Sequence, residues 1–417
     1  MKTFVDTIFF WNCLYITLAL CAPILSGQEV FRDFHFIPVG GHFSELDPNA
    51  EWEFEEGDSF YNKPLQVAKH LDIDLKNAVR TEMIFEYWGG HIGTSDQRVQ
   101  INETVWFELP QPEGTPDDPE CYYRTLLGNN AIEIPIEAFN DGENIFRFSA
   151  GPQICYDFGW GMYWIYGFTV RVYYSNDLNH PSGTVSAPSN SRGSLRIEAD
   201  IQPTDNSIAR VDFIGEYYDF DWDGDGIWKE WQYQSRNGTL HKHIGTRTKK
   251  PWTVKWDTKW IPEQEGPVRV RAIITDESGI SYQTEPITVN LPQERNRVVK
   301  AYRPYDVPEK FGVRNDRLRS CKFLLPDDLS QVKSARLIVS SWSADTDSKD
   351  SVSKLLMNKT SIAEDFGVHH DYSFDRLKIP ISSLTPGENS LYMYSDYTGH
   401  ALEINWPGPL LLLEMKR

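Results

Sequence analysis

The sequence predicts an all-β protein. Three segments alternate apolar and polar residues with a period of two, namely 132–136 (IEIPI), 168–174 (FTVRVYY) and 251–256 (PWTVKW). This period places the apolar side chains on one face of a strand. Clusters of Gly, Pro, Asn and Ser recur between such segments, and no long stretch has the period of a helix. At 417 residues the chain fits two or three domains.

The first 27 residues are typical of a signal peptide. Lys2 is followed by the apolar stretch IFFWNCLYITLALCAPIL and by the small residues of LSG. The alternative is an N-terminal membrane anchor. No later segment is apolar enough to span a bilayer. We therefore expect an exported protein that is secreted, periplasmic or held at the cell surface.

Two changes in composition divide the rest of the chain. Residues 175–194 are rich in Ser, Pro and Asn and are typical of a linker, and residues 290–310 mark a weaker boundary. The expected organisation is a signal peptide (1–27), a first β-sandwich (28–177), a linker (178–194), a central sandwich (195–298) and a last sandwich (299–417).

The first and last sandwiches repeat several sequence features in the same order, which predicts a duplicated module. The matching features are TEMIFEYW ending at Trp88 and ARLIVSSW ending at Trp342, NET at 102 and NKT at 358, IPIEAFNDGEN at 134–144 and IPISSLTPGEN at 379–389, and a Gly-Pro pair at 151 and at 408.

The segment 379–394 (IPISSLTPGENSLYMY) resembles the penultimate hairpin of galactose-binding-like jelly rolls. Many carbohydrate-binding modules and the accessory domains of secreted glycosidases and lyases use this sandwich. Residues 195–292 resemble an immunoglobulin or fibronectin-III-like sandwich of about seven short strands. The resemblance implies a jelly roll, an Ig-like domain and a second jelly roll, and it implies a carbohydrate context by analogy of fold.

The stretch DFDWDGDGIWKEW (219–231) predicts a calcium loop. Ca²⁺ accepts six to eight oxygen ligands in flexible geometry, and carboxylates at alternate positions can turn to one centre. One register satisfies the pattern D-x-D-x-D-G-x5-E and uses Asp219, Asp221, Asp223 and Glu230, with Gly224 at the turn.

A second register starts at Asp221, adds Asp225 and Gly226, and ends on the weaker ligand Gln232. The flanking segments are typical of strands, so we expect a hairpin loop that Ca²⁺ holds in a fixed shape. The alternatives are a solvated acidic turn without metal and paired catalytic acids of the kind used in glycoside hydrolysis.

Aromatic and polar residues mix most densely in three stretches of the first sandwich, 85–98, 120–129 and 153–168. Aromatic rings stack on the flat C–H faces of sugars, and His and Arg hydrogen-bond to hydroxyls. We expect a ligand surface formed by Trp88, His91, Tyr123, Arg124 and Trp160; the alternative is that these rings belong to a core.

A disulfide between Cys121 and Cys155 would join two of these stretches, because these are the only two cysteines within one predicted domain of an exported chain. The alternative is two buried thiols. Cys321 is then a single, buried thiol. A second candidate site lies at His369, His370 and Asp371, where a solvated loop is the alternative.

The formal charge of −19 argues against nucleic acid as a partner. The leading hypothesis is a secreted carbohydrate-binding protein that takes part in polysaccharide recognition or degradation. The alternative is an enzyme, a lyase or dehydratase acting on uronic-acid units, with His91 or Tyr123 as base and Arg124 neutralising the carboxylate. A glycoside hydrolase suits the residues less well, and an adhesion or scaffold protein is a further alternative. The sequence leaves open whether the protein is an enzyme.

Overall fold

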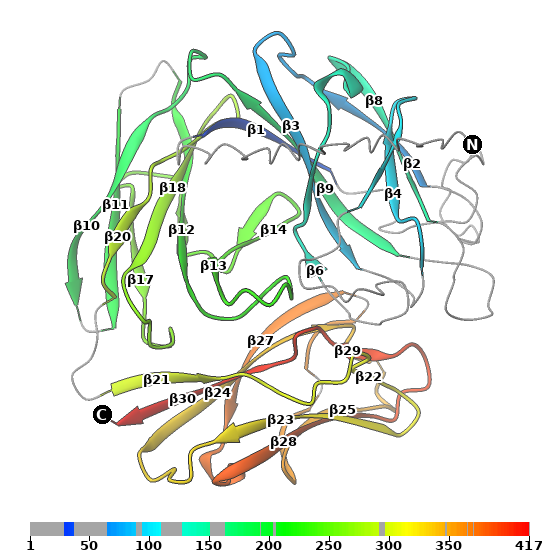
Figure 1. The fold of residues 1–417 in the computed structure, drawn as a ribbon, viewed down its shortest axis with the longest axis vertical. Coiled ribbons are helices and arrows are strands. Elements are labelled where there is room, and N and C mark those ends of the chain that lie inside the picture. The colour runs from blue at the N-terminus through cyan, green and yellow to red at the C-terminus, as the bar shows by residue number, and fades with distance from the viewer. Residues whose placement is uncertain are drawn as a thin grey trace, which may run out of the picture.

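The computed structural model describes residues 29–36, 65–88, 94–109, 127–150, 163–191, 193–202, 206–291, 297–346, 348–364, 366–369 and 371–416. Within these ranges the regular structure consists of β-strands and two short 3-10 helices, so the predicted all-β class is confirmed (Figure 1). No helix in these ranges is long and apolar enough to cross a membrane. The predicted signal peptide (1–27) lies outside the described residues.

The first sandwich pairs two layers of strands (Figure 1). One layer consists of β1 (Glu29–Phe36), β9 (Trp164–Tyr174), β3 (Ala78–Trp88), β6 (Leu127–Gly128) and β7 (Ala131–Glu133). The other layer has the order β2 (Leu65–Leu71), β8 (Gly142–Ser149), β4 (Arg98–Ile101) and β5 (Trp106–Glu108), and the 3-10 helix η2 (Ile136–Ala138) precedes β8.

The central sandwich also has two layers and an additional hairpin. The larger layer consists of β12 (Ile208–Tyr218), β13 (Lys229–Trp231), β16 (Gly245–Arg247), β18 (Val268–Asp276), β19 (Ile280–Gln283) and β20 (Ile287–Val289). The smaller layer has the order β10 (Gly183–Ser191), β11 (Ser194–Ile201) and β17 (Thr253–Asp257), and β14 (Gln234–Arg236) pairs with β15 (Thr239–His241).

The first and central sandwiches share one continuous sheet. Strand β1 pairs with β9 of the first sandwich along one edge and with β19 of the central sandwich along the other. The resulting sheet has 11 strands. A single hydrophobic cluster accordingly contains Phe85 and Phe168 of the first sandwich together with Phe213 and Val270 of the central one.

The last sandwich has its own core, which includes Cys321. This thiol is fully buried, as the sequence predicted. One layer consists of β21 (Arg297–Tyr302), β30 (Leu410–Lys416), β24 (Val332–Trp342), β29 (Leu402–Ile404), β22 (Gly312–Val313) and β27 (Tyr372–Ile379). The other layer has the order β23 (Arg317–Leu325), β28 (Gly387–Ser395), β25 (Ser353–Met357) and β26 (Thr360–Glu364), and the 3-10 helix η3 (Ile381–Ser383) precedes β28.

The strand order supports the predicted duplication. The order β2-β8-β4-β5 in the first sandwich matches β23-β28-β25-β26 in the last one. The same pair of asparagines also recurs. The Nδ2 of Asn102 donates to Oδ1 of Asn144 at 3.1 Å, and the Nδ2 of Asn358 donates to Oδ1 of Asn389 at 2.9 Å. Both pairs tie a turn of the four-stranded layer to the strand beside it.

The segment 178–194, which the sequence predicted to be a linker, contains strand β10. Its register shifts between Ser186 and Ser189 as it pairs with β11, and Pro188 lies inside this shift. Proline is tolerated on an edge strand at a bulge because no ladder hydrogen bond needs its missing N–H. The segment with a Ser- and Pro-rich composition is therefore an edge strand and not only a linker.

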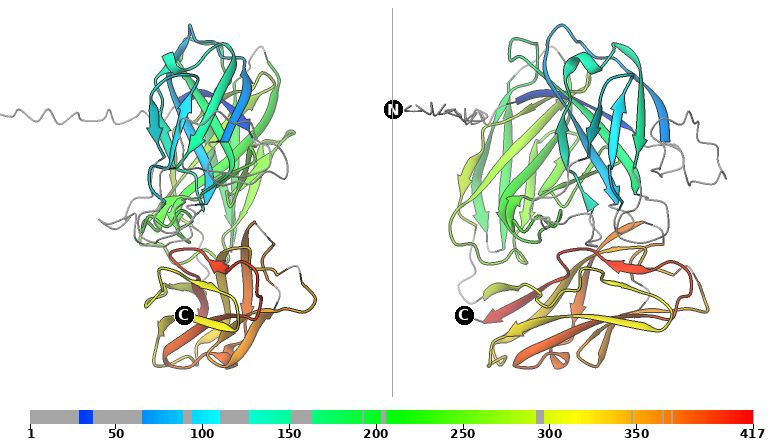
Figure 2. Two further views of the ribbon diagram at one scale, coloured as in Figure 1. Left: turned by 90° about the vertical axis from the view of Figure 1, so that its right-hand side faces the viewer. Right: turned by 45° about the vertical axis from the view of Figure 1, so that its right-hand side comes forward.

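The last sandwich packs beneath the other two (Figure 2). One hydrophobic cluster joins Phe220, Trp222 and Trp228 of the central sandwich to Ile338 and Leu412 of the last one. These three aromatic residues belong to the acidic stretch 219–231, so the loop that carries the carboxylates also forms the interface between two sandwiches.

Candidate functional site

The acidic stretch is a hairpin loop between β12 and β13, as the sequence predicted. The two strands pair antiparallel, with Tyr217 opposite Glu230. The loop closes with a hydrogen bond from the backbone N of Asp219 to the carbonyl of Trp228 at 3.0 Å. Gly224 and Gly226 have φ values of 75° and 91°, a region that favours glycine.

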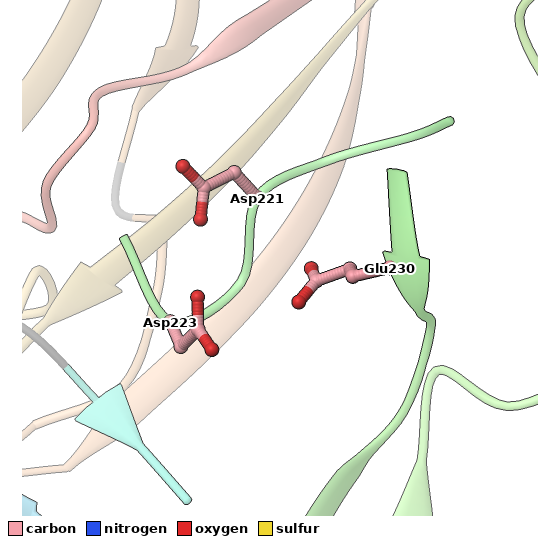
Figure 3. Close-up of side chains that lie close together, drawn as sticks. All are labelled: Asp221, Asp223 and Glu230. Carbon is pink, nitrogen blue, oxygen red and sulfur yellow. The ribbon is translucent and has the colours of Figure 1, made fainter. Parts of the chain in front are cut away.

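Three carboxylates meet inside this loop. One oxygen each of Asp221, Asp223 and Glu230 lies within 4.8 Å of the others, and Figure 3 shows the three groups facing a common space. Asp221 is fully buried, and its carboxylate accepts backbone hydrogen bonds from Gly224 at 2.7 Å and from Gly226 at 3.0 Å. These bonds fix the direction of its oxygens before any ion binds.

Two of the predicted ligands lie outside this cluster. The carboxylate of Asp225 accepts a hydrogen bond from the backbone N of Ile227 at 2.6 Å. Asp219 is buried and lines a different cavity together with Arg376. Gln232, the last position of the second register, accepts a hydrogen bond from the indole of Trp222 at 2.8 Å. The cluster thus consists of Asp221 and Asp223, which belong to both registers, and Glu230, which ends the first register.

Burial makes the cluster costly to ionise without a cation. Desolvation, reinforced by Asp223, raises the pKa of Asp221 to about 7 and that of Glu230 to about 9. Three hard carboxylate oxygens in a short, glycine-containing loop fit the preference of Ca²⁺, which would supply the missing positive charge.

The three aromatic stretches of the first sandwich converge at the lower end of β3. Trp88, the last residue of β3, pairs with Leu127 of the second stretch and with Trp164 of the third. The predicted residues His91, Tyr123, Arg124 and Trp160 lie outside the described residues, as do the side chain of Trp88 and the predicted disulfide between Cys121 and Cys155. The predicted disulfide and ligand surface stay predictions.

The other two sandwiches contribute to the same place, which we call the junction. It contains Glu86, Tyr166, Arg236, Trp342, Asp371, Tyr372 and His400. Arg236 of the central hairpin forms an ion pair with Asp371 of the last sandwich. The backbone N of Asn237 donates to both carboxylate oxygens of Glu86, at 2.9 and 3.1 Å.

Aromatic rings and histidine surround this ion pair. The indole of Trp342 donates to the hydroxyl of Tyr166 at 2.6 Å, and the ring of Tyr166 meets Tyr372 edge-on with the centroids 5.4 Å apart. The imidazole of His400 packs edge-on against Trp342 with the centroids 5.5 Å apart. In the second predicted site, His369 lies 5.3 Å from His400 between ring centroids, and His370 lies outside the described residues.

Burial raises the pKa of Glu86 to about 7, and the hydrogen bond from Asn237 acts in the opposite direction. Burial likewise raises the pKa of Tyr166. A carboxyl group with a pKa near neutrality can donate or accept a proton at physiological pH. Sequence analysis missed Glu86, Tyr166 and Arg236. The only signal was Glu86 in the aromatic stretch FEYW, since every partner comes from another sandwich.

No known protein family matches the chain, and no curated protein does. Among solved structures, a β-porphyranase of glycoside hydrolase family 86 from the human gut bacterium Bacteroides plebeius matches 57% of this chain and 37% of its own, with 14% identity and a TM-score of 0.23. The structure of BuGH86 in complex with neoagarooctaose matches 59% of this chain and 35% of its own, with 9% identity and a TM-score of 0.22.

A viral particle of infectious bursal disease virus matches 83% of this chain and 75% of its own, with 9% identity and a TM-score of 0.18. The protein thus spans little more than a third of the length of the two glycoside hydrolase chains. Scores at this level assign neither a fold family nor a function.

Proposed function

We propose that the protein is an exported carbohydrate-binding protein whose ligand site lies at the junction of its three sandwiches. The observation that supports this proposal is the meeting of Tyr166, Trp342 and Tyr372 with the Arg236–Asp371 ion pair, beside the ends of three aromatic stretches. Trp342 and Tyr372 are 6% and 3% exposed, so these rings form a rigid support for the charged groups, which offer partners for the hydroxyls of a sugar.

In the same proposal the acidic loop binds Ca²⁺ in a structural role. Asp221, Asp223 and Glu230 supply three carboxylate ligands, and the remaining oxygens would come from water or backbone. The loop packs against the last sandwich through Trp222, whose ring lies edge-on to Phe374 with the centroids 5.2 Å apart. Holding the loop in shape would therefore hold the sandwiches around the junction.

Binding is tested by calorimetry against a panel of neutral and acidic polysaccharides. Arg236→Gln removes the ion pair to Asp371, and we expect it to weaken binding at least tenfold, because a charge-assisted hydrogen bond is worth about 1.5–3 kcal/mol. Arg196→Gln is the matched control, because Arg196 is 54% exposed and pairs with Glu198 on the far layer of the central sandwich. Equal affinities of both variants and the parent would contradict a ligand site at the junction.

A second candidate function is a lyase or dehydratase acting on uronic-acid units, which the buried Glu86 favours. Its pKa of about 7 suits a general acid or base, and Arg236 lies close enough to lower that pKa. Turnover would release unsaturated uronates, which absorb ultraviolet light, so absorbance is followed during incubation with uronic-acid polysaccharides. An increase that is lost in Glu86→Gln supports the enzyme; binding without an increase supports the binding protein.

A further inference from the structure

A cavity separate from the junction and from the acidic cluster lies between the central and last sandwiches. It has a volume of about 290 Å³ and is lined by β12 and β17 on one side and by β24, β27 and β30 on the other. This volume lies just below the range for small-molecule sites, about 300–1,000 Å³. The cavity is therefore large enough for one small ring, and both sandwiches contribute to its wall.

The lining of this cavity is basic, although the whole chain is strongly acidic. Lys242, Lys255, Arg336 and Arg376 line it, against the carboxylates of Asp219 and Asp257. Within the described residues, none of the four cations is within ion-pair distance of a carboxylate. Arg336 instead stacks over the ring of Trp260, 4.1 Å from its centroid. Four cations against two carboxylates give this lining an excess of positive charge in a protein of net charge −19, and such a lining attracts an anion.

The remaining lining suits a sugar ring. Trp260 is half-buried and contributes aromatic surface on the side of the central sandwich, whereas Tyr217 and Trp256 are 5% exposed and form the wall behind it. Asp219 is 5% exposed, and its Oδ1 is buried without a hydrogen-bond partner in the described structure. A buried carboxylate oxygen without a donor costs free energy, and a ligand hydroxyl would satisfy it.

We propose that this cavity binds a single sugar residue carrying an anionic group, either a carboxylate or a sulfate ester. The anionic group lies among Lys255, Arg336 and Arg376, the sugar ring lies beside Trp260, whose face Arg336 covers, and a hydroxyl donates to Asp219. The choice of a sugar as the ligand rests on the proposed function. Because Lys255 comes from the central sandwich and both arginines from the last one, the ligand also bridges the two sandwiches.

The test uses the whole protein and four probes in calorimetry: D-glucuronate, D-galactose 6-sulfate, neutral D-glucose and inorganic sulfate. We expect one or both acidic sugars to bind at least tenfold more tightly than glucose and inorganic sulfate, and to bind more weakly as salt increases. A preference for glucuronate identifies a uronate site, and a preference for the sulfated sugar identifies a sulfate site. Inorganic sulfate binding as tightly as the sugars would overturn the assignment of a sugar ligand.

The variant Lys255→Gln/Arg376→Gln removes two exposed cations from the cavity wall, so its fold should persist. We expect it to lose at least tenfold in affinity for the acidic sugar. The matched control Lys333→Gln/Lys359→Gln makes the same change in net charge at exposed positions away from the cavity and should bind like the parent.

The variants distinguish a ligand site in the cavity from a ligand site at the junction. If polysaccharide binding depends on Arg236 while the cavity variant binds acidic sugars like the parent, the cavity inference is wrong and the junction stands. If acidic sugars bind through the cavity and Arg236→Gln changes nothing, the junction is wrong. If the parent protein binds neither polysaccharide nor acidic sugar, both are overturned.

Discussion

Glu86 illustrates what single residues contribute to this protein. It follows Phe85 in strand β3 and is 3% exposed, and its only hydrogen bonds in the described structure come from the backbone of Asn237, 151 residues later in the chain. Sequence spacing could identify Asp221, Asp223 and Glu230 as a group, because they lie in one short loop. No spacing could connect Glu86, Arg236 and Asp371, which meet only when three sandwiches have packed together.

The buried carboxyl of Glu86 makes stability depend on pH. Its pKa rises from 4.5 to about 7 on folding, so the folded state favours the protonated form. Its contribution is complete below pH 4.5 and is lost as the pH rises through about 7. A shift of this size corresponds to about 3 kcal/mol.

We therefore expect Glu86→Gln to remove part of the fall in melting temperature between about pH 5 and about pH 8. The measurement is a series of thermal melts of parent and variant across this range. Glu388→Gln, an exposed glutamate of the last sandwich, is the control and should follow the parent. Parallel curves for parent and Glu86→Gln would mean that Glu86 stays ionised in the folded protein.

Among the elements, the loop between β12 and β13 shows most clearly what a pattern can predict. Alternating aspartates with a glycine and a glutamate predicted the hairpin and all three carboxylates of the acidic cluster, because both depend on local geometry; Asp219 and Asp225, which the same pattern included, lie outside it. The same local reasoning failed at residues 183–191. Their strand β10 is held by pairing with β11, and a composition of Ser and Pro does not reveal that partner.

Calcium should stabilise the protein through this loop. An ion that binds only the folded state adds about 2.7 kcal/mol at a hundredfold excess over its Kd, so a chelator should lower the melting temperature by several degrees. Glu230→Gln keeps the shape of the side chain and should abolish this response, whereas Asp327→Asn, at an exposed position outside the cluster, should retain it. A melt that is insensitive to the chelator would show that no metal stabilises this loop.

The predicted disulfide between Cys121 and Cys155 would close a loop of about 35 residues and contribute roughly 3–4 kcal/mol in the chain-entropy model. We expect mass spectrometry of unreduced peptides to find the two cysteines linked. Two alkylated thiols at these positions would show that the aromatic stretches are held together by strand pairing alone.

At the scale of the whole molecule, the three sandwiches act as a connected body. The all-β class followed from the alternating segments, because each strand is specified by a local pattern. The sharing of a sheet through β1 could not be predicted, since one strand gives no sign of pairing on both edges with different sandwiches. The interface around Trp222 could not be predicted from the sequence either, because Phe374 and Ile338, which belong to the same cluster, come from another sandwich.

Trp222 should couple the unfolding of the central and last sandwiches. It is 5% exposed, and its ring lies between Phe220 and Phe374. We expect Trp222→Ala to cost about 3–5 kcal/mol and to split the calorimetric transition, with the last sandwich melting apart from the rest. Phe323→Ala, inside the core of the last sandwich, should destabilise that sandwich without affecting the interface. A single, merely shifted transition for Trp222→Ala would contradict the coupling.

The asparagine pairs that the two related sandwiches share determine whether two sequons of the chain can be glycosylated. Asn102 and Asn358 each begin an Asn-X-Thr sequon, which marks an acceptor for N-linked glycans. The amide nitrogen that would carry the glycan is already engaged, because Asn102 donates to the carbonyl of Ala138 at 2.8 Å and Asn358 donates to that of Ser383 at 2.7 Å. A glycan on either nitrogen would be directed into the buried turn. Peptide mapping of protein made in a glycosylating host should therefore find both asparagines bare, and any molecules modified there should be misfolded.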